Sequence, residues 1–103
     1  MNVIWHPRAE KGKDRISDYI RRRFGEKRME KFMQEVDDTV QMILLNPNIG
    51  PIDPLYAHRS KTYRSVIING LSKMVYYIEG DTIRIAAFWD TRCEPKKQAA
   101  QTE

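Results

Sequence analysis

The chain has 103 residues, of which 41% are hydrophobic and 31% are charged. This composition predicts one folded domain and excludes a largely disordered chain. Eighteen Lys and Arg against fourteen Asp and Glu give a net charge of +4, which favours a polyanionic or acidic partner. No apolar run approaches the roughly 20 residues of a membrane span, and the lone Cys93 cannot form an internal disulfide. We therefore expect a cytoplasmic protein with no membrane partner.

The first half of the chain predicts one short strand and two helices. Residues 3–5 are an apolar run that ends before Pro7, which is typical of a strand followed by a helix start. Apolar residues then recur at helical spacing over residues 8–24 and 26–45, with Gly25 between them. Because this connection is so short, the two helices are predicted to form an antiparallel hairpin.

The second half predicts a crossing loop and three strands. Residues 46–54 hold three of the five prolines, which suits neither a helix nor a central strand. Strand-like runs follow over residues 62–68, 72–78 and 83–92, and Asn69-Gly70 between the first two is a strong hairpin signal. The predicted fold class is α+β: a helical hairpin packed on one face of a small, mainly antiparallel four-stranded sheet, whose other face is left free.

The same patterns give the domain organisation. Residues 1–92 are predicted to form a single domain that contains every periodic segment. Residues 93–103 lack apolar periodicity, and we expect them to be a flexible C-terminal tail.

Cations interrupt the apolar strand runs at three points, Arg64, Lys73 and Arg92. Such interruptions cost stability unless each charge reaches water or a partner. If the Asn69-Gly70 turn sets the register, Arg64 and Lys73 share a face of the sheet, and Arg92 completes the site. Converging cations would bind phosphate, and with RNA as substrate they would stabilise the charge that a 2′-hydroxyl attack develops. The alternative is an ordinary polar strand surface facing solvent.

Three further basic residues precede the second strand: His58, Arg59 and Lys61 are candidate nucleic-acid or target-binding residues. Neither histidine has metal-ligand spacing with Cys93, so we expect no metal and no cofactor. A denser basic cluster lies around the helix connection, and its charge pattern predicts a solvated helix surface rather than the active surface. This cluster comprises Arg21, Arg22, Arg23, Lys27, Arg28 and Lys31.

Six short motifs, together with the predicted helix pair around Ile20 and Phe32, follow a fixed order and cover nearly the whole chain. The motifs are Val3-Ile4-Trp5, Leu45-Asn46-Pro47-Asn48-Ile49-Gly50, Tyr63-Arg64, Met74-Val75-Tyr76-Tyr77, Gly80-Asp81-Thr82-Ile83, and Asp90-Thr91-Arg92 with Pro95. Their order and spacing resemble the RelE/ParE superfamily of toxins from bacterial type II toxin-antitoxin modules. The resemblance implies the order β-α-α-β-β-β and a toxin held inactive by a cognate antitoxin, with an amphipathic antitoxin helix packed on the helical hairpin.

Two activities occur in this superfamily: RelE-like members cut mRNA in the ribosome, and ParE-like members block DNA gyrase. Arg64 stands where the RelE-like branch has a strand lysine, Lys73 where it has a phosphate-binding arginine, and Arg92 where it has another arginine. Val66 replaces the second lysine of that branch, and no tyrosine follows Arg92. This sequence therefore does not match the general acid and base of the RelE-like pattern. Lys61 or His58 would have to substitute.

The residues and the resemblance together favour a ParE-like toxin that acts by binding DNA gyrase. The first alternative is a RelE-like, ribosome-dependent mRNA endonuclease that uses Arg64, Lys73 and Arg92 to stabilise charge. The second alternative is a nucleic-acid-binding module without toxicity, which the basic composition alone permits.

Overall fold

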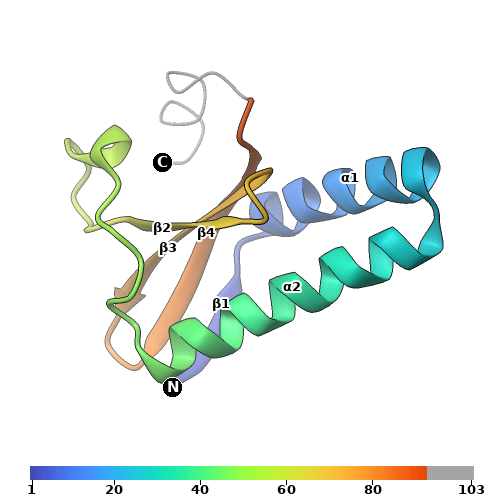
Figure 1. Ribbon diagram of the computed structural model, residues 1–103. Helices are drawn as coiled ribbons and strands as arrows, with labels where there is room; N and C mark the ends of the chain where they lie inside the picture. Colours follow the sequence, from blue (N-terminus) through green and yellow to red (C-terminus); the bar gives the residue numbers. More distant parts are fainter. Residues whose placement is uncertain (93–103) are drawn as a thin grey trace.

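The computed structural model describes residues 1–92, and the predicted C-terminal tail lies outside them (Figure 1). The elements follow the predicted order β-α-α-β-β-β, with a short 3-10 helix, η1, added in the long connection. They are β1 (Asn2–Trp5), α1 (Pro7–Phe24), α2 (Glu26–Leu45), η1 (Pro54–Tyr56), β2 (Arg64–Ile68), β3 (Ser72–Glu79) and β4 (Thr82–Asp90).

The sheet has four strands in the order β1-β4-β3-β2. Strands β2, β3 and β4 form an antiparallel meander, and β1 pairs in parallel with β4. The backbone nitrogen of His6 continues this pairing by donating to the carbonyl of Ile85 at 2.9 Å. The predicted α+β class and the mainly antiparallel four-stranded sheet are therefore confirmed.

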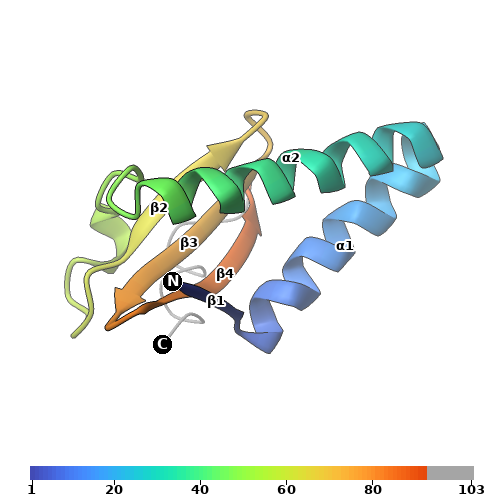
Figure 2. The ribbon, with the colours of Figure 1, turned by 90° about the horizontal axis from the view of Figure 1, so that it is seen from below.

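The helical hairpin starts and turns at residues whose backbone chemistry suits those places. His6 caps α1, because its Nδ1 accepts a hydrogen bond from the backbone nitrogen of Arg8 at 3.1 Å, and Pro7 occupies the first turn. Gly25 joins the helices with φ 95°, a left-handed value that favours glycine. Both views show the turn of the hairpin projecting beyond the sheet (Figures 1 and 2).

That projecting turn carries the basic helix cluster. Every residue from Arg21 to Arg28 is exposed, which agrees with a solvated surface. Arg21 pairs with Asp18 at 3.4 Å on the same helix face. Such exposed pairs contribute little to stability.

The main core fills the space between the hairpin and one face of the sheet, where α2 crosses the strands (Figure 2). The rings of Trp5 and Phe32 lie 6.2 and 6.1 Å from the ring of Phe88. Helix α1 approaches β4 so closely that a Cβ atom on Gly12 would lie 2.2 Å from the carbonyl oxygen of Phe88. The buried residues of this core include Phe32, Val36, Ile43, Met74, Tyr76, Ile83, Ile85 and Phe88.

The opposite face of the sheet is not free, which corrects the expectation from the sequence. The connection from α2 to β2 folds back beside the sheet and carries η1 (Figure 1). Tyr56 and Tyr63, with rings 5.0 Å apart, cover Val75 and Ala87 in a second buried cluster. Aromatic side chains bury large apolar areas, which explains why a loop rich in proline and tyrosine covers part of this face.

Candidate functional site

The turn between β2 and β3 sets the strand register, and the register determines which face of the sheet each strand cation occupies. Asn69 and Gly70 adopt φ values of 54° and 68°, as an Asn-Gly turn predicts, and Leu71 donates its backbone N–H to the Ile68 carbonyl at 3.1 Å. A regular two-residue turn would pair Ile68 with Leu71. Instead Ile68 pairs with Ser72, so Leu71 is an extra residue in the connection.

This shift of one residue changes the face that each later side chain occupies. Arg64 pairs with Tyr76, whose side chain belongs to the core under the helices. Lys73 pairs with Ile67 and lies on the opposite face. The prediction that Arg64 and Lys73 share a face is therefore wrong.

Arg64 holds the loop that follows α2. Its Nη1 donates to the carbonyl oxygens of Gly50 at 2.8 Å and Asn48 at 3.2 Å. Beside it, the Tyr76 hydroxyl donates to the carbonyl of Pro47 at 2.7 Å and accepts from the Gly50 N–H at 3.0 Å. Burial raises the pKa of Tyr76, so this phenol stays protonated. The contacts give Arg64 a structural role.

Lys73 is neutralised within the protein. Its Nζ donates to Oδ2 of Asp53 at 2.8 Å, and the two side chains are 12% and 4% exposed. The other carboxylate oxygen of Asp53 accepts from the Leu55 N–H at 3.0 Å, which caps η1. A cation this well covered and paired is poorly placed to bind an external phosphate.

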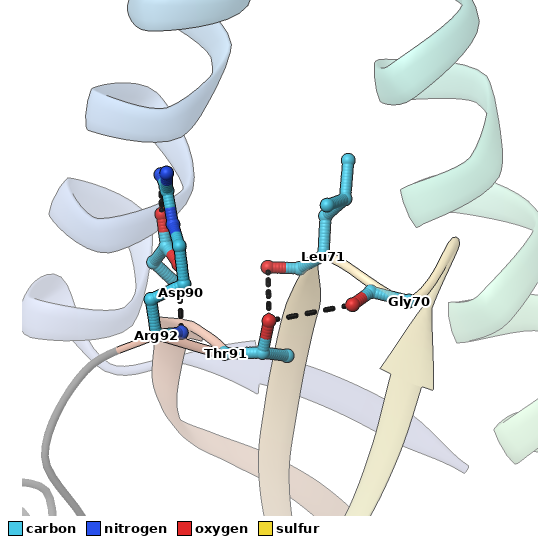
Figure 3. Close-up of polar contacts among 5 residues, drawn as sticks. All are labelled: Gly70, Leu71, Asp90, Thr91 and Arg92. Atoms are coloured by element: carbon cyan, nitrogen blue, oxygen red, sulfur yellow. Dashed lines mark hydrogen bonds and ion pairs between the residues drawn. The ribbon is translucent and has the colours of Figure 1, made fainter.

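Arg92 lies at the end of β4, where Asp90 holds its guanidinium (Figure 3). Arg92 donates through Nε at 3.0 Å and through Nη2 at 2.6 Å to the two carboxylate oxygens. These bonds lower the pKa of Asp90 and raise that of Arg92. Thr91 next to it bonds through Oγ1 to the carbonyls of Gly70 and Leu71, both at 3.3 Å, and so ties β4 to the hairpin turn.

Lys61, one of the two predicted substitutes for the general acid and base, lies on the sheet face opposite Arg64. His58, Arg59 and Lys61 follow η1, and Lys61 Nζ lies 4.7 Å from the ring centre of Tyr77, on the face opposite the helices. Val66 packs against the main core. The structure thus places Lys61 and Lys73 on one face and Arg64 on the other.

An apolar groove on the helix side was not predicted as a site from the sequence. It encloses about 240 Å³ between the hairpin helices and the β2–β3 turn. Tyr19, Phe24 and Leu71 line it and are 45%, 54% and 58% exposed. Exposed large apolar side chains gathered at one place mark a binding surface more often than scattered ones do.

The groove has a charged rim. Arg28, Lys31 and Arg92 contribute cations, and Glu35 and Asp90 contribute carboxylates. The guanidinium of Arg28 lies 5.5 Å from the ring centre of Phe24, against the aromatic lining. The sequence signal for this groove was the spacing of apolar residues in both helices, but Leu71 joins it only through the turn geometry.

Residues 1–92 contain neither a candidate metal site nor a candidate membrane-spanning helix. Across residues 1–92, no group of three or more His, Cys, Asp or Glu side chains is positioned to hold a metal ion. None of the described helices combines the length and the apolar character needed to cross a membrane.

Several solved structures are similar to this chain, including the following two. One, described as a chromosomal ParDE TA system from P. aeruginosa, has a TM-score of 0.70 at 19% sequence identity, covering 87% of this chain and 95% of the other. The other, described as the YoeB dimer from Staphylococcus aureus, has a TM-score of 0.58 at 21% identity, covering 84% and 92%. At these identities the likeness shows a shared fold.

The sequence of the chain identifies the family within that fold. Residues 3–94 match the family described as "ParE toxin of type II toxin-antitoxin system, parDE". The chain therefore belongs to the ParE toxin family and is a type II toxin with a cognate antitoxin as partner. No curated protein sequence matches it significantly.

Proposed function

We propose that this toxin inhibits growth by binding its target, and that the target is DNA gyrase rather than ribosome-bound mRNA. One observation carries the proposal. The cations that would form an mRNA-cleaving site are separated, because Arg64 and Lys73 lie on opposite faces of the sheet and both are bonded within the protein.

The local chemistry supports the same proposal. Cleavage of RNA by 2′-hydroxyl attack needs a base and an acid within hydrogen-bond reach of the reacting atoms. The positions next to Arg64 instead hold Val66, in the core, and the buried hydroxyl of Tyr76, which is already bonded to two loop backbone groups. Because the described residues beside Arg64 offer no free acid or base, we infer that the toxin acts by occupying a surface of its target.

We further propose that the antitoxin is held in the apolar groove. Tyr19, Phe24 and Leu71 offer apolar contacts, and the cations on the rim suit a segment that combines apolar and acidic side chains. Both the groove and the exposed hairpin would then be covered in the inactive complex.

Induction of the gene in growing cells, followed by pulse labelling, tests the target. A gyrase-directed toxin is expected to cause a DNA damage response and filamentation, while protein synthesis continues during the first minutes. Immediate loss of protein synthesis would instead support the mRNA endonuclease. A neighbouring reading frame that encodes a short protein able to restore growth would identify the antitoxin.

A pair of variants tests the groove. Leu71→Glu places a charge among the apolar side chains of the groove, and we expect it to weaken antitoxin binding by about tenfold or more in a calorimetric titration. Ile67→Glu is the matched control, because Ile67 is 53% exposed and lies on the sheet face opposite the helices, outside the groove. Equal affinities for the two variants would place the antitoxin elsewhere.

A further inference from the structure

An open cavity of about 370 Å³ lies on the sheet face opposite the helical hairpin. The start of α1, the edge of β1 and the chain before β2 enclose it. Its lining includes His6, Arg8, Lys61 and Arg84, together with the aromatic ring of Tyr77, and none of the lining residues among residues 1–92 carries a carboxylate. Its volume falls within the range of about 300–1,000 Å³ typical of small-ligand sites.

The strand register places three side chains of the cavity side by side on the sheet. Ile4 pairs with Arg84 across β1 and β4, and Arg84 pairs with Tyr77 across β4 and β3, so these three side chains form one row on this face. Arg84 bonds through Nε to Oε1 of Glu79 at 2.8 Å, which orients the side chain. The strands thus place a guanidinium between an aliphatic and an aromatic side chain.

Lys61 adds a second cation from the loop. Its Nζ lies 4.7 Å from the ring centre of Tyr77, and the described part of the chain gives it no carboxylate partner. This differs from Lys73, whose charge is neutralised by Asp53 at 2.8 Å. Lys61 therefore keeps its capacity to bind an anion.

The start of α1 contributes side chains rather than backbone donors. Pro7 has no N–H, the Arg8 N–H is bonded to Nδ1 of His6, and the N–H groups of Ala9 and Glu10 are bonded to the His6 carbonyl. An anion in the cavity would consequently be bound by the side chains of Arg8, Lys61 and Arg84.

We propose that this cavity is a binding site for a nucleotide, with the phosphate held by Lys61, Arg84 and Arg8 and the base against Tyr77 and Ile4. A concave site that combines cations with an aromatic and an aliphatic side chain suits a phosphate joined to a flat base. The carboxylates of an acidic peptide would pair with the cations but would make no stacking contact with the Tyr77 ring. The proposal does not depend on gyrase being the target.

His6 supplies a spectroscopic reporter for the bound phosphate. Nε of Arg8 donates to Nδ1 of His6 at 3.2 Å, so the imidazole accepts and is neutral in this arrangement. Desolvation and the Arg8 charge lower the pKa of His6. A phosphate bound beside Arg8 would add negative charge and raise that pKa again.

The test is a titration of the full-length toxin with a nucleoside monophosphate, a short single-stranded oligonucleotide, inorganic phosphate and an acidic peptide of equal charge. We expect one of the two nucleotide ligands to bind at least tenfold more tightly than phosphate or the peptide and to raise the pKa of His6 measured by NMR. Tight binding of the monophosphate indicates a free nucleotide, and binding of the oligonucleotide alone indicates a nucleic-acid strand. Equal binding of the peptide, or an unchanged His6 pKa, would overturn the proposal.

Two variants test whether the nucleotide binds in this cavity. Lys61→Ala and Arg84→Gln should each weaken nucleotide binding by about tenfold. Lys27→Ala is the control, because it removes one exposed positive charge from the helical hairpin, outside the cavity. A thermal melt of each variant shows whether it is folded. Equal losses in all three folded variants would mean unspecific attraction by the net charge, and would overturn the site.

Discussion

At the scale of single residues, the cations of the predicted site have three different environments. Arg64 supports a loop, Lys73 is paired in the interior with Asp53, and Lys61 lies over an aromatic ring with its charge available. A sequence pattern shows the charge of each residue but not its partner. Burial and pairing therefore separate the structural cations from the candidate binding cations.

The pair of Lys73 and Asp53 gives a stability prediction. Asp53→Asn retains an oxygen that can accept from the Leu55 N–H, but it leaves the Lys73 charge, which is 12% exposed, without a counterion. We expect the free energy of unfolding to fall by about 3 kcal/mol, as measured by chemical denaturation. Adding Lys73→Met should recover a large part of this loss, because the double variant has no unpaired charge.

An exposed ion pair on the same sheet is the control for that measurement. Glu79→Gln removes the partner of Arg84, whose side chain and that of Glu79 are 39% and 54% exposed. Exposed pairs contribute about 1 kcal/mol or less. A loss for Asp53→Asn as small as that for Glu79→Gln would contradict the structural role assigned to Lys73.

The lowered pKa of His6 predicts how the stability of the folded protein depends on pH. Desolvation first, and then the charge of Arg8, lower its folded-state pKa below the ordinary value of 6.5. The unfolded chain then binds more protons between the lowered pKa and 6.5, so stability rises with pH through that window and is lost as pH falls through the folded-state pKa. NMR titration of Arg8→Gln should show a higher His6 pKa, and Arg15→Gln, farther along α1, should leave it unchanged.

At the scale of elements, the close approach of α1 to β4 depends on Gly12. Alanine usually stabilises a helix relative to glycine by up to about 1 kcal/mol. Here a Cβ atom would lie 2.2 Å from the Phe88 carbonyl oxygen, so Gly12→Ala must separate the helix from the strand. We expect a net loss of about 1–3 kcal/mol in thermal or chemical denaturation.

Lys11→Ala tests whether that loss comes from the contact rather than from helix propensity. Lys11 is exposed on the same helix, so its replacement should change the free energy of unfolding by less than about 0.5 kcal/mol. Equal or greater stability of Gly12→Ala would show that α1 does not pack on β4 at this distance.

The elements also show how far the sequence alone could predict the structure. Apolar periodicity and Gly25 predicted the helical hairpin, with α2 confirmed at residues 26–45. Asn69-Gly70 predicted the β2–β3 turn, but Leu71 enters as an extra residue and reverses the face of Lys73 relative to Arg64. A one-residue register shift depends on packing across the sheet, which local propensity does not encode.

The candidate sites were harder to predict than the fold for the same reason. The groove joins Phe24 at the end of α1 to Leu71 in a strand turn, and the cavity joins His6 to Lys61. These residues are far apart in the chain, and none belongs to a short motif with its own chemistry. Only the sheet order, with β1 beside β4, brings the start of α1 to the face that Lys61 approaches.

At the scale of the whole molecule, the two sides of the sheet have different characters. The helix side carries the apolar groove with a charged rim, and the opposite side carries the cationic cavity and the tyrosine cluster. Separate surfaces would allow the antitoxin and a nucleotide to bind at the same time. In contrast, the cations expected to cut RNA are divided between the two sides.

The most direct test of the account compares the purified full-length toxin in two reactions at equal concentrations. In one it is mixed with DNA gyrase and relaxed plasmid, and in the other with translating ribosomes whose mRNA ends are mapped. We predict that supercoiling by gyrase is inhibited and that the mRNA stays intact. Cleavage of the mRNA in the ribosome with gyrase activity unchanged would contradict a toxin that acts by binding gyrase.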